Sequence, residues 1–416
     1  MEMNNKETRR VVIGITAHVD AGKTTLAEAM LYRTGQLRKL GRVDHGSAAM
    51  DSHLLERERG ITIFLSQAEL PLGDMEVTLL DTPGHVDFSA EMERTLSVLD
   101  YAILVISGAD GVQAHTRTLW RLLELYRVPT FLFVTKMDFG RRDRDCLMES
   151  LRHELGEGCV DFTPTARDRR MEQLATCRED ALEAYLDTGM VPEELVRQLV
   201  GRRLVFPCWF GSGLKLEGID EFLEGLARYV EPPAYPAAFS ARVFKISHDA
   251  QGKRLTHLKV TGGTLRVRDA ISYGGRQEKA AQLRIYTGGR FRPVDQVPAG
   301  GICAVQGLTA TWGGQGLGER EEAVRPVLEP VMRYRMALPP DCDSRVLLPQ
   351  LRQLEEEDPQ LHIAWNEQTR QIHVQLMGEI QLEILQRMIR ERFGLEVAFG
   401  PGTICYRETI AAPVEG

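Results

Sequence analysis

"AHVDAGKTT", residues 17–25, lies between the apolar run "VVIGIT" (residues 11–16) and "LAEAMLYRTG" (residues 26–35), whose apolar residues have helical spacing. The stretch fits the pattern G-x-x-x-x-G-K-[ST], except that Ala17 stands in place of the first glycine. A buried strand followed by such a loop and a helix is typical of a phosphate-binding unit. A glycine-containing turn between a strand and a helix, with no ligand, is the alternative interpretation.

The chemistry of the loop explains these residue types. Backbone N–H groups from Asp20 to Thr25 can point at a β-phosphate, and Gly22 lets the backbone approach it closely. Lys23 would add a positive charge at the β- and γ-phosphates, and the Thr24 hydroxyl would bind Mg²⁺. The helix that follows aims the positive end of its dipole at the same phosphates. We therefore expect a nucleoside triphosphate here.

Two later segments extend the phosphate side of this site. "RGITI" contains Thr62 in a polar stretch, where its hydroxyl could complete the Mg²⁺ coordination only while a γ-phosphate is present. "DTPGH" follows the strand-like "VTLL", so that Asp81 can hold a magnesium-bound water and the Gly84 N–H can reach the γ-phosphate. Ligands of open parallel sheets bind at such strand ends.

Two further segments predict which base is bound. "TKMD" follows the strand-like "FLFV", and the Asp138 carboxylate would accept both guanine N1–H and N2–H₂, a pair that adenine cannot supply. "GSG" (residues 211–213) could offer a backbone N–H to guanine O6. Thr135 stands where N-K-x-D motifs have asparagine, so we expect some bonds of this loop to be weaker while Asp138 retains the guanine selectivity.

His85 is the candidate catalytic residue. It follows the glycine that would sense the γ-phosphate, and a side chain there can orient the attacking water. A solvent-facing loop histidine is the alternative. Thr24, Thr62 and Asp81 are the expected Mg²⁺-binding residues. The expected contacts with GTP or GDP are Ala17, His18, Val19, Asp20, Ala21, Gly22, Lys23, Thr24, Thr25, Asp81, Thr82, Pro83, Gly84, His85, Thr135, Lys136, Met137, Asp138, Ser212, Gly213 and Leu214.

Length and composition restrict the number of domains and the classes of partner that we expect. At 416 residues, and with about 150 residues per domain, the chain predicts about three domains. A net charge of −8 argues against nucleic-acid binding over the whole surface, although residues 252–269 and 386–393 are locally basic; a solvated face is the alternative for each. The sequence has no apolar run of membrane-spanning length and no signal-peptide core. Seven scattered cysteines without C-x-x-C pairs indicate reduced thiols, and we expect a cytoplasmic monomer.

The pattern along the chain predicts a multidomain α/β, β and α/β architecture. Residues 1–235 alternate apolar runs with helical patterns, which predicts a P-loop domain with a parallel sheet covered on both faces. Residues 236–325 contain strand-like runs between glycine turns, which predicts a small β-barrel. Residues 326–405 read β-α-β-β-α-β, the order of a ferredoxin-like split βαβ sandwich. Residues 406–416 begin a further segment.

The quoted motifs, together with "LLERERGITI" and "DTPGHVDFSAEMERTLSVLDYAILVISGADGVQAHT", give the chain a clear resemblance to translational GTPases of the elongation factor G class. The resemblance runs from Val11 to about Glu408, and alanine at position 17 is usual in that class. Residues 41–63, "GRVDHGSAAMDSHLLERERGITI", and the modest span between Asp138 and Gly211 are most similar to the tetracycline-resistance ribosomal protection proteins.

The resemblance implies a GTPase domain, a β-barrel and an α/β sandwich, followed in the family by a fourth and a fifth domain. "TICYRETI" is similar to the junction into the fourth domain, so we expect a truncated chain, with a natural short paralogue as the alternative. The implied partner is the ribosome, through its rRNA and proteins, which would stimulate hydrolysis. An elongation factor G paralogue acting in translocation and a non-catalytic GTP-sensing regulator are the alternative functions.

Overall fold

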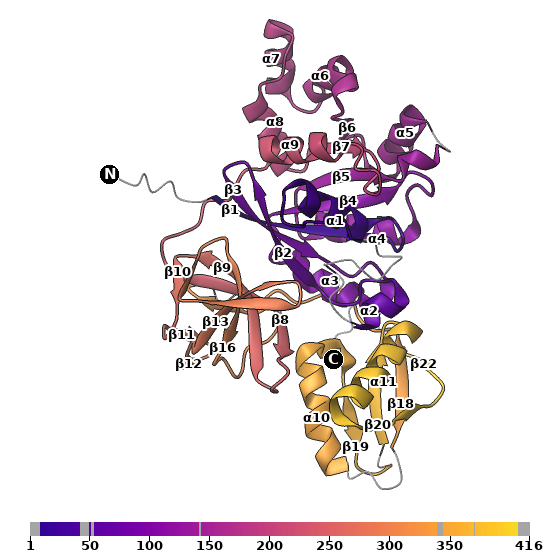
Figure 1. Ribbon diagram of the computed structural model, residues 1–416, viewed down its shortest axis with the longest axis vertical. Coiled ribbons are helices and arrows are strands. Elements are labelled where there is room, and N and C mark those ends of the chain that lie inside the picture. Colours follow the sequence, from indigo (N-terminus) through magenta and orange to yellow (C-terminus); the bar gives the residue numbers. More distant parts are fainter. Residues whose placement is uncertain are drawn as a thin grey trace, which may run out of the picture.

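The computed structural model describes residues 9–41, 50, 54–140, 143–320, 322–338, 344–369 and 371–406. Of residues 41–63, which carry the narrower resemblance, residues 42–49 and 51–53 lie outside these ranges, as do residues 407–416 of the expected fourth domain. Figure 1 shows three parts in chain order: a large α/β part in indigo to magenta, a β part in orange, and a small α/β part in yellow.

A seven-stranded sheet forms the centre of the first part. Its strands are, in sheet order, β2 (Ser66–Leu72), β3 (Met75–Asp81), β1 (Arg9–Ala17), β4 (Tyr101–Ser107), β5 (Thr130–Thr135), β7 (Phe206–Phe210) and β6 (Cys159–Asp161). Our prediction of a parallel sheet is wrong at one edge, because β2 pairs antiparallel with β3. Exposed and buried residues alternate along β2, as expected for an antiparallel edge strand with one covered face.

Helices cover both faces of this sheet. Alternate residues of β4 show this: Tyr101, Ile103 and Val105 belong to one apolar core, and the residues between them belong to another. The helices are α1 (Lys23–Arg33), α2 (Leu54–Arg59), α3 (Ser89–Leu96), α4 (Ala114–Leu125), α5 (Arg144–Leu155), α6 (Arg167–Ala175), α7 (Glu179–Thr188), α8 (Glu193–Gly201) and α9 (Ile219–Tyr229). Among all the helices that the structure describes, none has both the length and the apolar character that crossing a bilayer requires.

The second part is an all-β domain built around one apolar core, to which its main sheet and both of its two-stranded ribbons contribute residues such as Val243, Leu265 and Ile271. The main sheet has the order β14-β13-β16-β9-β8-β17, and the ribbons are β10-β15 and β11-β12. The strands are β8 (Ser240–His248), β9 (Arg254–Gly262), β10 (Thr264–Arg266), β11 (Ala270–Tyr273), β12 (Arg276–Lys279), β13 (Gln282–Thr287), β14 (Arg290–Val294), β15 (Gln296–Pro298), β16 (Ile302–Gln306) and β17 (Gly316–Gly318).

The third part has the predicted β-α-β-β-α-β order, and its sheet order β19-β20-β18-β21 is that of a split βαβ sandwich. Leu347, Leu351 and Leu354, on the first helix of this part, are buried in one apolar core with the strands of the sheet. The elements are β18 (Met332–Ala337), α10 (Ser344–Glu357), β19 (Ala364–Asn366), β20 (Gln371–Leu376), α11 (Glu379–Phe393), β21 (Ala398–Phe399) and β22 (Thr403–Ile404).

A buried ion pair joins the first part to the β domain. The Lys259 ammonium donates to Asp100 Oδ1 at 2.5 Å and to the Val98 carbonyl oxygen at 3.0 Å. The other Asp100 oxygen accepts from the Val12 N–H at 2.8 Å. Because the Lys259 side chain is only 4% exposed, this charge depends on its partners for stabilisation.

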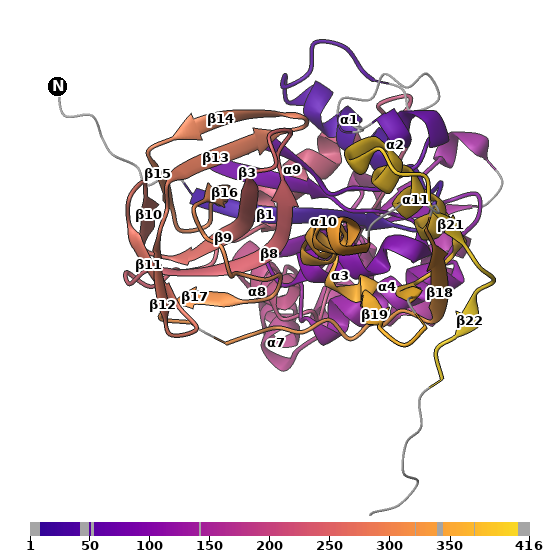
Figure 2. The same ribbon diagram turned by 90° about the horizontal axis from the view of Figure 1, so that it is seen from below.

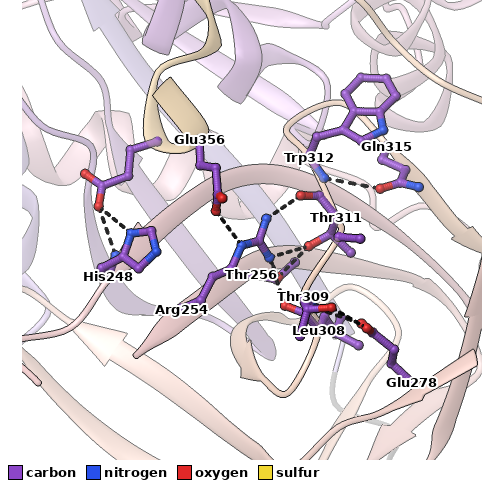
Figure 3. A network of polar contacts seen from close by, with 12 residues as sticks. His248, Arg254, Thr256, Glu278, Leu308, Thr309, Thr311, Trp312, Gln315 and Glu356 are labelled. Carbon is purple, nitrogen blue, oxygen red and sulfur yellow. Dashed lines mark hydrogen bonds and ion pairs between the residues drawn. The ribbon is translucent and has the colours of Figure 1, made fainter. Parts of the chain in front are cut away.

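The β domain meets the third part through the β8–β9 hairpin (Figure 3). The Arg254 guanidinium donates to Glu356 of α10 at 2.8 Å and, on its other side, to the Thr311 hydroxyl at 3.0 Å. His248 Nδ1 lies 2.9 Å from Glu357 of the same helix. Figure 3 shows Arg254 between the carboxylate of α10 and the loop that carries Thr311. The three parts are therefore joined by specific polar contacts.

Candidate nucleotide-binding site

A pocket of about 700 Å³ lies where the loops after β1, β3, β5 and β7 meet. It is lined by most of the predicted contacts: His18, Val19, Asp20, Gly22, Lys23, Thr24, Thr25, Thr62, Gly84, His85, Thr135, Lys136, Asp138, Ser212, Gly213 and Leu214. Six other predicted contacts are described by the structure but do not line the pocket: Ala17, Ala21, Asp81, Thr82, Pro83 and Met137. Asp81 nevertheless contacts two lining residues, as described below.

The loop after β1 contains left-handed backbone conformations that suit its residues. The Ala21 N–H donates to the His18 carbonyl at 3.1 Å, closing a turn. Asp20 (φ 60°) and Gly22 (φ 90°) both have left-handed backbone conformations, which aspartate tolerates and glycine adopts without cost. α1 begins at Lys23, where the Leu26 N–H donates to the Gly22 carbonyl. The amino end of α1 therefore borders the pocket.

The three predicted metal-binding residues lie together with the loop lysine. The Thr24 and Thr62 hydroxyl oxygens are 3.0 Å apart, and Thr24 Oγ1 is 3.4 Å from Asp81 Oδ2. The Lys23 ammonium donates to Asp81 Oδ1 at 2.5 Å and to the Thr62 hydroxyl at 3.0 Å. Burial raises the pKa of the Asp81 carboxyl, and the adjacent ammonium of Lys23 opposes that shift.

This donor set fits magnesium, because Mg²⁺ prefers oxygen ligands and is bound in proteins by few side chains together with phosphates and water. Two hydroxyls and one carboxylate converge here from α1, β3 and the segment after α2. Within the described residues, no cluster of three or more His, Cys, Asp or Glu side chains offers another metal centre.

The loops after β5 and β7 form the other end of the pocket. Asp138 lines it with a side chain that is 12% exposed, and Lys215 Nζ lies 3.7 Å from its Oδ2 atom. The Met137 N–H donates to the Gly211 carbonyl at 3.2 Å, which ties the two loops together. The two ends of the pocket thus have different chemistry: cationic and hydroxyl-rich at one, carboxylate-bearing at the other.

Thr135 connects these two ends. Its hydroxyl donates to the Ala21 carbonyl of the phosphate loop at 2.5 Å and lies 3.2 Å from the Ile106 carbonyl. We expected a threonine here to weaken the bonds that asparagine would make. In the structure, the single hydroxyl retains the connection to the phosphate loop.

His85 lies in the pocket lining and is held by its own loop. Its Nδ1 atom lies 3.2 Å from the Asp87 N–H, which donates to it, and 3.4 Å from Asp87 Oδ1, so Asp87 contacts this side of the ring through both its backbone and its carboxylate. The side chain is 21% exposed, and its ring packs edge-on to Phe88. The preceding Gly84 lies close to the phosphate loop, since a Cβ there would be 3.4 Å from the Ala17 carbonyl oxygen.

Sequence reasoning missed five residues that line the pocket: Glu58, Arg59, Gly60, Ile61 and Phe139. The first four precede Thr62 in "LLERERGITI". The motif therefore contained them, but only its threonine was predicted to contact the ligand. Phe139, whose side chain is 64% exposed, carried no signal in the sequence.

Comparison with protein families decides the classification. Residues 8–232 match the elongation factor Tu GTP-binding domain, residues 238–317 match elongation factor G domain 2, and residues 327–401 match elongation factor G domain III. The chain belongs to the translational GTPases of the elongation factor G type. The predicted fold class is thereby confirmed for this chain, while the boundaries at residues 235 and 325 stay predictions.

Individual relatives agree with this classification. The chain is 36% identical to the oxytetracycline resistance protein of Streptomyces rimosus and 29% identical to mitochondrial ribosome-releasing factor 2 of Drosophila yakuba; each alignment covers 96% of this chain and 66% of the relative. A crystal structure of a protein from Thermus thermophilus matches with a TM-score of 0.84 at 26% identity, covering 94% of this chain and 67% of that one. The chain spans just under two thirds of the length of these curated relatives.

Proposed function

We propose that this chain binds GTP with Mg²⁺ and hydrolyses it to GDP and phosphate, that the ribosome stimulates the reaction, and that the protein acts as a tetracycline-resistance ribosomal protection protein. One observation carries the proposal. A single pocket contains Lys23, Thr24 and Thr62 at one end and Asp138 at the other, so that it can hold a triphosphate and a guanine at the same time.

At the phosphate end, the N–H groups at the start of α1 and the Lys23 ammonium would bind the β- and γ-phosphates. Thr24 and Thr62 would hold Mg²⁺ through their hydroxyls, and Asp81 would do so through a water. The ion, when bound, neutralises charge on the phosphate oxygens. The ammonium of Lys23, shared here between Asp81 and Thr62, exchanges those partners for phosphate.

His85 would act on the attacking water. Phosphoryl transfer depends mainly on positioning and on stabilising charge, so a residue that orients water is sufficient. The contacts of Asp87 with Nδ1 would fix the ring and leave Nε2 to contact the water. Thr62 and Gly84 would close over the γ-phosphate and separate from it after hydrolysis.

At the base end, Asp138 would accept two N–H bonds from guanine, and the loop at residues 212–214 would donate to guanine O6. Thr135 would keep this end fixed relative to the phosphate loop through its bond to Ala21. We also propose a cytoplasmic location and a monomer.

The resistance role rests on the name of the relative at 36% identity, and the name of the relative at 29% favours a second candidate, another ribosome-directed factor. An elongation factor G paralogue in translocation belongs to this second class. A non-catalytic regulator is disfavoured because both His85 and Thr62 line the pocket.

The experiment has three parts. Calorimetry with Mg²⁺ should detect GTP binding and at least a hundredfold weaker ATP binding, an estimate based on two lost bonds to a carboxylate at about 1.5 kcal/mol each. GTP turnover should rise when ribosomes are added. Release of tetracycline from ribosomes would distinguish protection from translocation. Equal affinity for GTP and ATP would refute the proposal.

A further inference from the structure

Asp87 lies two residues after His85 and makes contacts in two directions. Its N–H donates to His85 Nδ1 at 3.2 Å, and its carboxylate Oδ1 lies 3.4 Å from the same nitrogen. Its carboxylate Oδ2 accepts from the backbone N–H groups of Ile380 at 2.9 Å and Gln381 at 3.3 Å, which belong to the first turn of α11 in the third domain. One residue thus joins the candidate catalytic ring to a helix 293 residues further along the chain.

The contact with α11 is a strong one. Asp87 is 6% exposed, and the N–H groups it binds have no partners within their own helix. A carboxylate at the amino end of a 15-residue helix also gains from the helix dipole. Losing these bonds would leave a buried carboxylate and two helix N–H groups without partners, so the loop is held firmly.

Neighbouring contacts fix the position of α11 relative to the loop that carries His85 and Asp87. The Gln381 side chain donates to Asp358 Oδ2 at 3.0 Å, and the other oxygen of Asp358 accepts from Arg94 of α3 at 3.0 Å. Further along α11, Glu383 pairs with Arg59 beside the pocket. Figures 1 and 2 show α11 lying against α2, so this helix contacts segments on both sides of the γ-phosphate end.

We propose that Asp87 is a positioning residue through which the third domain sets the orientation of the His85 ring. The proposal rests on the proposed role of His85 in hydrolysis. When α11 is docked, the carboxylate of Asp87 is fixed, its N–H is aimed at Nδ1, and Nε2 is held toward the reacting water. When α11 moves away, the loop loses its anchor and the ring turns freely.

Gly378 permits a test from the far side of the contact. It is the residue before α11, and a Cβ on it would overlap the Asp87 carboxylate. Its φ of −173° is extended backbone that alanine adopts equally well, so Gly378→Ala displaces the carboxylate without backbone strain. Gly400→Ala is the matched control in the same domain, because a Cβ there meets its nearest neighbour at an ordinary 3.7 Å.

The experiment measures single-turnover GTP hydrolysis and the affinity for a fluorescent GTP analogue in the whole chain. Gly378→Ala and Asp87→Ala should each slow hydrolysis about tenfold, the effect of losing one charge-assisted bond, with analogue affinity unchanged. The double variant should be no slower than Asp87→Ala alone, because both changes break the same contact. Gly400→Ala should behave as the unaltered chain.

A second readout does not depend on turnover. With ¹³Cε1-labelled histidine, the His85 resonance, assigned through His85→Ala, should shift in Gly378→Ala and stay in place in Gly400→Ala. An unmoved resonance, unaltered hydrolysis in Gly378→Ala, or multiplying effects in the double variant would overturn the proposal. If His85→Ala itself hydrolyses GTP at the unaltered rate, the proposed function fails instead, and the resonance still reports on the contact.

Discussion

Replacing Asp138 by asparagine tests how the base is recognised. The Asp138 side chain is 12% exposed at the base end of the pocket, and asparagine has nearly the same volume, so the pocket should keep its shape. A carboxylate offers two acceptor oxygens to guanine N1–H and N2–H₂, whereas the amide offers one acceptor and places an N–H₂ group opposite a donor.

The magnitude follows from these groups. The variant loses one bond to a charged acceptor, about 2 kcal/mol, and leaves one buried donor unmet, about 1–3 kcal/mol. The sum of about 3–5 kcal/mol corresponds to a loss of GTP affinity of roughly 100- to 4000-fold at about 1.4 kcal/mol per tenfold change. XTP, which has a carbonyl oxygen in place of N2–H₂, should gain, since the amide can donate to it.

The assay is competition of GTP and XTP against a fluorescent GDP analogue with Mg²⁺ present. Asp187→Asn, a change on the exposed surface of α7, is the matched control and should leave both affinities unaltered. If Asp138→Asn kept the original preference for GTP over XTP, the assignment of Asp138 to the base would be refuted.

Three further changes probe other parts of the site. His85→Ala should lower turnover about 100-fold or more, the usual contribution of a positioned proton-transfer or water-holding group, and leave GTP affinity nearly unaltered in calorimetry; equal losses of both would exclude it from the mechanism. Thr135→Ala removes the bond to the Ala21 carbonyl, so GTP affinity should fall about five- to tenfold, equivalent to about 1–1.4 kcal/mol, in the same titration. Burial lowers the pKa of His115 to about 4 from 6.5, so the folded state disfavours its charged form. The free energy of unfolding should therefore be highest above pH 6.5 and should fall by up to about 3 kcal/mol as the pH drops toward 4, at about 1.36 kcal/mol per pKa unit. His115→Leu should reduce this fall when unfolding by urea is measured at each pH. An unaltered pH dependence in the variant would contradict the argument.

Helical spacing of apolar residues predicted the helix after the phosphate loop, although α1 also buries Lys23 and Glu28. No motif described above indicated α3, whose buried residues include Glu93 and Arg94. The carboxylate of Glu93 accepts from the backbone N–H groups of Val327 and Leu328, and Arg94 pairs with Asp358 of the third domain. A helix whose buried face is satisfied by distant partners has no signature within its own sequence.

The site divides in a similar way. Lys23, Thr62 and Asp138 could be predicted because each belongs to a short motif whose chemistry is local to a strand end. The contact of Asp87 with α11 joins segments far apart in the sequence, and nothing near Asp87 indicates its partner. Phe139 lines the pocket only because the turn after β5 leaves it there.

The buried pair of Lys259 and Asp100 has a consequence for how the protein moves. The observed orientation of the first two domains brings this ammonium and this carboxylate together, and a rotation that broke the pair while leaving either charge buried would cost several kcal/mol. The first two domains should therefore behave as one rigid unit. A rearrangement that begins at the pocket would then be transmitted to the third domain rather than absorbed by the second.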